Sequence, residues 1–226
     1  MENPGSHLLS NSSVAIRSNY TAPGASVLPC STYSRIPSLS GLFRVLRRSH
    51  TLREITNLLS GGDRRSLGRS GEVAKLVTQN PELLPQLVAL LRHDERVVAI
   101  RAADVLEKVQ ARLPEELFAP FKSEFVSLAL STTQPEMRWH LAQMLPRLCL
   151  SRSQRRAVVR ILESYFTDRS AIVRVFALQA VVDLARRDPT LHSLARERIE
   201  KAMQGSAAER ARARIVLAQF FELNAG

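Results

Sequence analysis

The chain has 226 residues, of which 45% are hydrophobic, and it carries a formal net charge of +11. It contains no apolar run of the roughly 18 residues that a membrane-spanning helix needs, so we expect no membrane contact. The positive charge favours an acidic partner, either a protein or a nucleic acid, because the field of the chain attracts both.

The basic residues are 28 arginines and four lysines. Guanidinium groups suit phosphate and carboxylate partners, but a genome rich in G and C gives the same excess of arginine. The two cysteines, Cys30 and Cys149, belong to no CxxC motif or Cys/His cluster. This arrangement indicates reduced thiols rather than a disulfide or a zinc site. We therefore predict a cytoplasmic protein without a metal or other cofactor.

Residues 1–41 are rich in Ser, Pro, Gly and Asn and hold few periodic apolar residues, which predicts a disordered tail. The segment lacks the basic flank and apolar core of a secretory signal. Its serine-rich, acid-poor character is shared with organellar transit peptides. A start codon assigned too far upstream would give the same composition.

Ordered structure is predicted over residues 42–226, beginning with N-terminal cap helices over 42–79. Thr51 and Glu54 have the spacing of a capping box, and the helix that they open is predicted to stop at Gly61–Gly62. A second cap helix is predicted over Glu72–Gln79.

The loop between the two cap helices, GGDRRSLGRS, collects glycines and arginines beside a helix N-terminus. Arg64, Arg65, Arg69 and Ser70, the last as the predicted helix cap, form a candidate anion-binding loop, because free amides and the helix dipole favour phosphate or sulfate there. The spacing is not that of a nucleotide-binding P-loop. The alternative is a surface loop whose arginines are solvated or pair with nearby acidic residues.

From residue 80 to residue 226 the sequence is repetitive. An arginine followed by apolar residues at helical spacing recurs every 36 residues, at Arg138, Arg174 and Arg210, and a copy 39 residues before the first has Ala99 in the arginine's place. Apolar residues at helical spacing with such a period predict stacked helical hairpins. We therefore predict an all-α, right-handed solenoid of about four hairpins, preceded by the cap and the tail.

The helix after Asp168 resembles the second helix of HEAT repeats. The resemblance is carried by Asp168, Val173, Arg174, Ala177 and Ala180–Val181. It extends from about residue 72 to residue 221 and implies that Asp168 and Arg174 join neighbouring repeats in a ladder. Because Thr132 and Gln204 take the aspartate's place in the adjacent copies, we expect that ladder to be incomplete.

The residues Met137 to His140, MRWH, are similar to the HEAT repeats of phycobilin lyases, although such repeats also occur in proteins without a pigment. HEAT relatives with di-iron hydroxylase activity use His-Glu pairs as ligands, and none of the five histidines here is followed by Glu. The alkylpurine DNA glycosylase with a HEAT-like body is similar in shape. This resemblance implies nucleic-acid binding as an alternative function.

Trp139, the only tryptophan, is predicted to project away from the apolar stripe of its helix and to lie beside Gln143. With Arg138 next to it, it is a candidate for stacking on a partner; the alternative is packing against the adjacent repeat. Arg138, Arg174 and Arg210 form a candidate row for carboxylate or phosphate. The alternative, which we prefer, is salt bridging between repeats.

No nucleophile motif such as GxSxG organises the serines and histidines. We therefore predict a non-catalytic scaffold that binds another protein, as a helix or an extended peptide. Nucleic-acid binding, in DNA repair or a glycosylase-like role, is the first alternative. A lyase-type HEAT protein is the second.

Overall fold

The computed structural model describes residues 52–61 and 66–222. The predicted tail of residues 1–41 lies outside these ranges. The described residues contain no β-strand and form ten α-helices. Their bounds are α1 Leu52–Leu59, α2 Ser70–Gln79, α3 Leu84–Ala89, α4 Arg96–Gln110, α5 Lys122–Ser131, α6 Pro135–Met144, α7 Arg152–Tyr165, α8 Ala171–Arg187, α9 His192–Met203 and α10 Ala207–Glu222.

Short 3₁₀ segments extend or join several of these helices. They lie at Pro81–Leu83, Leu90–Arg92, Glu115–Phe121, Leu145–Arg147 and Pro189–Leu191. The segment after α6 contains Pro146, which cannot donate an amide hydrogen bond, and the α-helical pattern ends before it, at Met144. Pro85 is tolerated because it lies in the first turn of α3, where amides have no partner within the helix.

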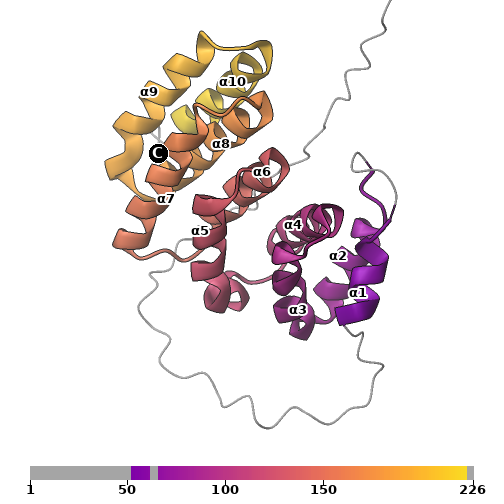
Figure 1. Cartoon of the computed structure of the whole chain (residues 1–226). Coiled ribbons are helices and arrows are strands. Elements are labelled where there is room, and N and C mark those ends of the chain that lie inside the picture. The colour runs from indigo at the N-terminus through magenta and orange to yellow at the C-terminus, as the bar shows by residue number, and fades with distance from the viewer. Residues whose placement is uncertain (1–51, 62–65, 223–226) are drawn as a thin grey trace, which may run out of the picture. The chain divides into compact units, whose positions relative to one another are not determined.

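The helices pair into hairpins that stack in chain order (Figure 1). After the α1–α2 pair come four hairpins, α3–α4, α5–α6, α7–α8 and α9–α10. The second helices form one layer, in which α2, α4, α6, α8 and α10 each pack against the next. First helices contact one another on the other side, as α1 does α3 and α5 does α7. The predicted HEAT-like, all-α solenoid with an N-terminal cap is confirmed.

The core lies between and along the two layers, where the repeated apolar positions meet. Leu145 and Val181 are both 0% exposed and occupy equivalent places in consecutive repeats. Their counterpart Leu217, in the terminal helix, is half-buried against the same core. A fully buried leucine or valine contributes about 1.5–3 kcal/mol, so each hairpin depends on its neighbours for this burial.

The cap differs from its prediction at one boundary. Helix α1 ends at Leu59, followed by Gly61 with φ of 73°, the left-handed conformation that ends many helices. Helix α2 begins at Ser70, two residues before the predicted start. Ser70 is thus the first helical residue, and it forms no side-chain cap.

Cys149 is disulfide-bonded, so the predicted reduced thiol is wrong at this position. The disulfide does not support the predicted cytoplasmic location, because cysteines in that compartment are usually reduced. Among the described residues, no helix is long and apolar enough to cross a membrane.

Candidate functional site

Trp139 packs on the next repeat, which is the alternative to stacking on a partner. Its ring lies 5.4 Å from the ring of Phe176 on α8 and 4.5 Å from that of His140, both centroid to centroid. The side chain is half-buried against the core, which leaves part of the indole at the surface. Gln143, one turn along α6, donates to the carbonyl of Trp139 at 3.3 Å.

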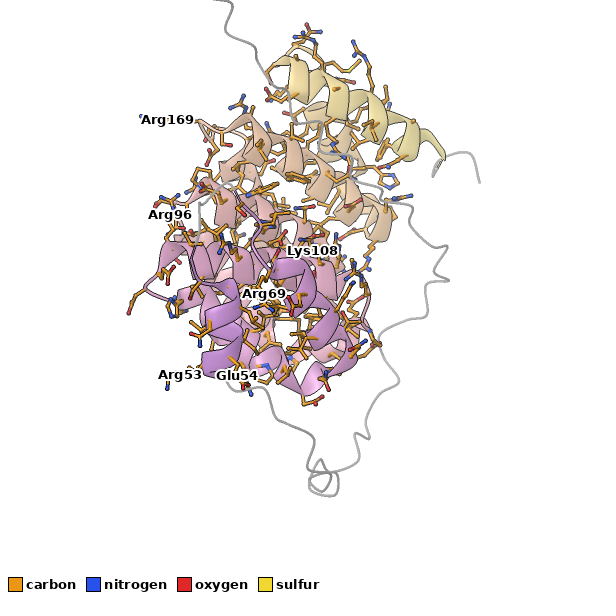
Figure 2. The ribbon with its side chains drawn as sticks, turned by 90° about the vertical axis from the view of Figure 1, so that its right-hand side faces the viewer. Arg53, Glu54, Arg69, Arg96, Lys108 and Arg169 are labelled. Atoms are coloured by element: carbon orange, nitrogen blue, oxygen red, sulfur yellow. The ribbon has the colours of Figure 1, made fainter. Side chains whose placement is uncertain are left out.

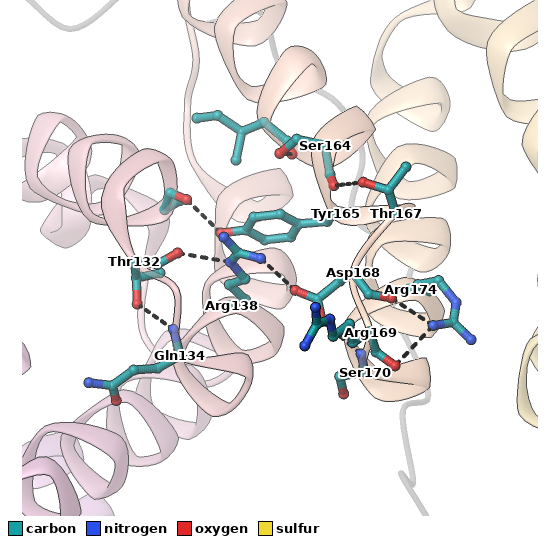
Figure 3. Close-up of polar contacts among 12 residues, drawn as sticks. Thr132, Gln134, Arg138, Ser164, Tyr165, Thr167, Asp168, Arg169, Ser170 and Arg174 are labelled. Atoms are coloured by element: carbon teal, nitrogen blue, oxygen red, sulfur yellow. Dashed lines mark hydrogen bonds and ion pairs between the residues drawn. The ribbon is translucent and has the colours of Figure 1, made fainter.

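Arg138 joins two consecutive repeats at the start of α6. Its Nε donates to the carbonyl of Thr132 at 2.8 Å, and its Nη1 contacts Asp168 Oδ2 at 2.5 Å (Figure 3). The guanidinium carbon also lies 5.2 Å from the centre of the Tyr165 ring, within the range of a cation–π contact. Tyr165 donates its hydroxyl to the carbonyl of Ala129 at 2.7 Å, and burial raises its pKa.

Arg174 repeats this arrangement one hairpin later. Its Nη1 donates to the carbonyl of Asp168 at 2.7 Å, while Nε and Nη2 hold the two oxygens of Glu209 at 2.9 and 3.0 Å. Each arginine therefore fixes the loop of its own hairpin through a carbonyl and reaches the following repeat through a carboxylate. Salt bridging between repeats was the preferred prediction for this row, and the geometry matches it.

The ladder is more complete than the sequence predicted, because its members are displaced. Glu209 supplies the carboxylate that Gln204 cannot. At the other end, α4 has Ala99 at the arginine position, and Arg96, one turn earlier, contacts Glu136 at 2.8 Å instead. Arg96 and Arg169 lie on the same side of the molecule (Figure 2).

Arg210 ends the row in a different setting. It is exposed, and its Nη1 donates to the carbonyl of Gly205 at 2.6 Å. It thus fixes its own loop as Arg138 and Arg174 do, and among the described residues no carboxylate pairs with it. Its guanidinium is accessible to a partner.

The residues of the candidate anion-binding loop point in different directions. Arg69 forms two bonds of 2.8 Å to Glu72, an exposed pair. The hydroxyl of Ser70 is buried and donates to Asp104 Oδ2 at 2.6 Å. Arg64 and Arg65 lie outside the described residues. The structure therefore does not bring Arg69 and Ser70 together around one anion.

The loop is instead organised around Arg101, which the sequence analysis did not single out. This side chain on α4 is 3% exposed and donates to the carbonyls of Leu59 and Gly61 at 2.8 and 2.6 Å. It also donates to Ser66 at 3.2 Å. Gly68, with φ of 50°, passes so close that a Cβ would lie 2.9 Å from the guanidinium carbon. The glycines thus allow the loop to close over a buried cation.

Ser70, Asp104 and Lys108 form the one cluster that combines a hydroxyl, a carboxylate and an amine in the described part of α2 and α4. Lys108 Nζ lies 2.5 Å from Asp104 Oδ2 and 3.5 Å from the serine hydroxyl. Because Ser70 is 0% exposed, no substrate can reach its oxygen in this arrangement. The cluster joins the cap to the first hairpin.

Burial also shifts the pKa of other titratable groups on the second helices. Burial lowers the pKa of His140, whose Nδ1 has no hydrogen-bond partner. It raises the pKa of Asp183, which accepts a bond of 2.9 Å from Gln179. Over the described residues, no group of three or more His, Cys, Asp or Glu side chains is placed to hold a metal ion.

The outward side of the second helices offers a candidate surface for a partner. We call it the second-helix face. Its apolar part comprises the exposed Ile172 and Ile215 and the half-buried Trp139, together with Val175 and Phe176, which are largely buried at 8% exposure each. Ile172 and Ile215 are 45% and 49% exposed, and they are two of the six large apolar side chains exposed in the described part of the chain.

The polar part of the same face lies at the middle of α8 and along α10. Gln179 donates to Gln219 at 3.3 Å and accepts from Arg212 at 3.2 Å. The guanidinium of Arg212 lies 5.7 Å from the Phe176 ring centre, and its burial lowers its pKa. The face thus combines an apolar strip with amides and a near balance of charge.

The comparisons with known proteins find likeness in structure alone. No family model matches the chain, and no curated protein matches it. One chain in the structure of the complex of CpcE and CpcF of phycocyanin lyase from Nostoc sp. PCC7120 is similar, with a TM-score of 0.57 and 15% identity over 74% of this chain and 97% of that chain.

Two engineered proteins from a structural genomics consortium are also similar. One has a TM-score of 0.53 and 18% identity over 76% of this chain and 80% of its own length. The other has a TM-score of 0.51 and 18% identity over 77% and 81%. Together with the hairpin stack and the arginine ladder, these likenesses identify the fold of this chain as a HEAT-like helical-repeat solenoid.

Proposed function

We propose that this chain is a non-catalytic scaffold that binds another protein through the second-helix face. The observation that carries the proposal is the exposure of Ile172 and Ile215 on neighbouring helices of one layer, beside the half-buried Trp139. Apolar side chains flanked by amides and paired charges have the composition of protein interfaces, in which an apolar centre is surrounded by a polar rim.

The charge of the face favours a protein over a nucleic acid. Asp183 and Arg212 are of opposite sign and both contact Gln179. A surface for phosphates needs an excess of unpaired cations, which this face does not offer. The ladder arginines Arg138 and Arg174 are held by carboxylates at the edge of the layer.

A partner helix or extended peptide suits the dimensions of the face. The axes of neighbouring packed helices lie about 10 Å apart, so three second helices offer a strip of about 20 Å for the apolar side of one helix. The likeness to a lyase complex of two named components supports a protein as the partner.

The test is affinity capture from the native host with the full chain as bait. The variant Ile172→Glu/Ile215→Glu places two charges on the apolar strip and should reduce specific partner recovery at least tenfold. Leu130→Glu is the matched control, because Leu130 is 74% exposed but lies on α5, in the first-helix layer. Circular dichroism should show both variants folded. Equal recovery by all three baits would contradict the proposed binding face.

A lyase-like role is the second candidate, favoured by the likeness to phycocyanin lyase. It is tested by mixing the chain with a phycobilin and recording the visible absorption spectrum. A shifted pigment band that Trp139→Ala abolishes, but Leu130→Glu preserves, would support it. An unchanged spectrum would remove it.

A further inference from the structure

A row of arginines covers the outward side of α7, away from the second-helix face. Arg152, Arg156 and Arg160 recur every four residues and are all exposed. Four residues of helix rise about 6 Å, so the three side chains follow one another along a single side of the helix. We call this surface the α7 arginine face.

These three arginines differ from the others on the same hairpin. Arg155, between them in sequence, contacts Asp188 Oδ2 at 2.6 Å, and Arg198 of α9 pairs with Glu163 of α7. Within the described part of the chain, no carboxylate pairs with Arg152, Arg156 or Arg160. Their charges are therefore available to a ligand, while Arg155 serves to hold the next loop.

The arginines border a surface pocket of about 310 Å³ between α7 and the loop that leads to α9. Its lining includes all four arginines together with Val159 and Leu191. Asp188 is the acidic residue of the lining, and its carboxylate is already held by Arg155 and by the amide and hydroxyl of Thr190. Hydrogen bonds from Thr190 and Arg155 lower the pKa of Asp188, which stays ionised. The pocket retains an excess of three positive charges.

The position of the row is fixed by the start of α7. Ser151 and Gln154 form a reciprocal capping box, in which each side chain bonds the other residue's amide. The opposite side of the helix is anchored by Val158, Leu162 and Tyr165, which are nearly or fully buried. The arginine side chains can change rotamer, but the orientation of α7 keeps all three on the same side of the helix.

We propose that the α7 arginine face binds the phosphate backbone of nucleic acid without reading its sequence. A linear row of unpaired guanidinium groups matches a linear array of phosphates, and each guanidinium can bond two oxygens of one phosphate. No aromatic side chain lines the pocket, so base stacking, which holds single strands in many proteins, is not provided. Binding should therefore depend on charge and be similar for any sequence.

The test uses the full chain and a fluorescein-labelled duplex DNA of mixed sequence, with anisotropy measured from 50 to 200 mM salt. Three phosphate contacts give a slope of log K against log salt of about −2.7, which is about a 40-fold loss over that range. The variant Arg152→Gln/Arg156→Gln/Arg160→Gln should lose most of this slope and bind at least tenfold more weakly at 50 mM salt. A second duplex of unrelated sequence should bind equally.

The control variant, Arg53→Gln/Arg112→Gln/Arg214→Gln, removes the same charge from exposed positions on other elements. It should retain the DNA affinity of the wild type within about twofold, because it leaves the α7 arginine face intact. Nonspecific attraction by net charge alone would instead give equal losses of affinity in the two variants. Equal losses would overturn the proposal, as would an unchanged affinity of the α7 variant.

Poly-glutamate of matched charge is the competitor that separates a nucleic acid from an acidic protein. If it displaces the DNA at equal charge concentration, the row recognises carboxylates as well and the assignment to phosphate fails. The Ile172→Glu/Ile215→Glu variant should bind DNA as the wild type does, so loss of partner capture and loss of DNA binding are independent results.

Discussion

Arg138 and Asp168 are joined at 2.5 Å across two consecutive repeats, although 30 residues separate them in the sequence. The carboxylate is 6% exposed and the guanidinium 25%, so the pair is largely removed from water. The second oxygen of Asp168 accepts the amide of Ser170 at 2.7 Å. A single side chain therefore fixes the start of α8 and its distance from α6.

Replacing Asp168 by Asn should destabilise the fold by about 2 kcal/mol, because Arg138 would keep its charge in a half-buried place without a counter-charge. Urea unfolding followed by circular dichroism measures the loss. Glu197→Gln is the control: its pair with Lys201 is exposed, and its removal should leave the midpoint unchanged. Equal midpoints for Asp168→Asn and the wild type would show that the ladder does not stabilise the stack.

The acid stability of the last hairpin should depend on Glu209. Hydrogen bonding to Arg174 lowers the pKa of this carboxyl to about 2, below its ordinary value of 4.5. A depressed folded-state pKa gives stability that is present above pH 4.5 and is lost as the pH falls toward 2. Wild type should therefore exceed Glu209→Gln in stability at pH 6, and the difference should vanish near pH 2. A difference independent of pH would contradict the assigned pairing.

Arg101 should hold the cap on the solenoid. Replacing it by Met would leave the carbonyls at the end of α1 without their donor and should cost about 3 kcal/mol, with the loss confined to the cap. Hydrogen exchange should show faster exchange in α1 and α2 and unchanged protection in α8. Arg112→Met, at an exposed position after α4, should change neither region.

Replacement by alanine should change the stability of the fold in opposite directions at Gly68, just before α2, and at Gly71, within it. Gly68→Ala should destabilise by about 1–2 kcal/mol, because the backbone has a positive φ and the Cβ would meet Arg101. Gly71 lies within α2 with nothing within 4 Å of its Cβ position. Gly71→Ala should therefore stabilise by roughly 0.5–1 kcal/mol. Thermal unfolding of the two variants provides the comparison.

Trp139→Ala should destabilise the chain by about 2 kcal/mol, less than a fully buried tryptophan would, because the ring contacts Phe176 on one side and solvent on the other. Trp139→Phe should recover most of the loss by keeping an aromatic contact. The measurement is urea unfolding followed by circular dichroism, since both changes remove the tryptophan fluorescence. Equal unfolding midpoints for Trp139→Ala and Trp139→Phe would indicate that the ring does not pack on α8.

The architecture was predictable because it rests on apolar spacing. The positions of Leu145 and Val181 recur at a fixed interval. This apolar spacing determines which side of each helix is buried, independently of the polar residues. The first cap helix ended before Gly61 as expected, because glycine permits the left-handed backbone conformation by itself.

Side-chain partners were less predictable, since they depend on which groups the fold brings together. Arg101 binds main-chain carbonyls, which every residue has, so no sequence pattern marks its acceptors. Ser70 has the composition of a helix cap but is drawn to Asp104, 34 residues away. The unpaired state of Arg152, Arg156 and Arg160 follows from how the nearby acids are used, because Asp188 is held by Arg155 and Glu163 by Arg198, which only the packing reveals.

The bridges from Arg96 and to Glu209 bear on how such chains are found by sequence comparison. A profile that assigns each residue type to one fixed column scores a bridge displaced by a helical turn as two mismatches, although the stack is joined as before. Stacks of this kind are better compared by where cations and carboxylates meet in space than by the residue type at a fixed position.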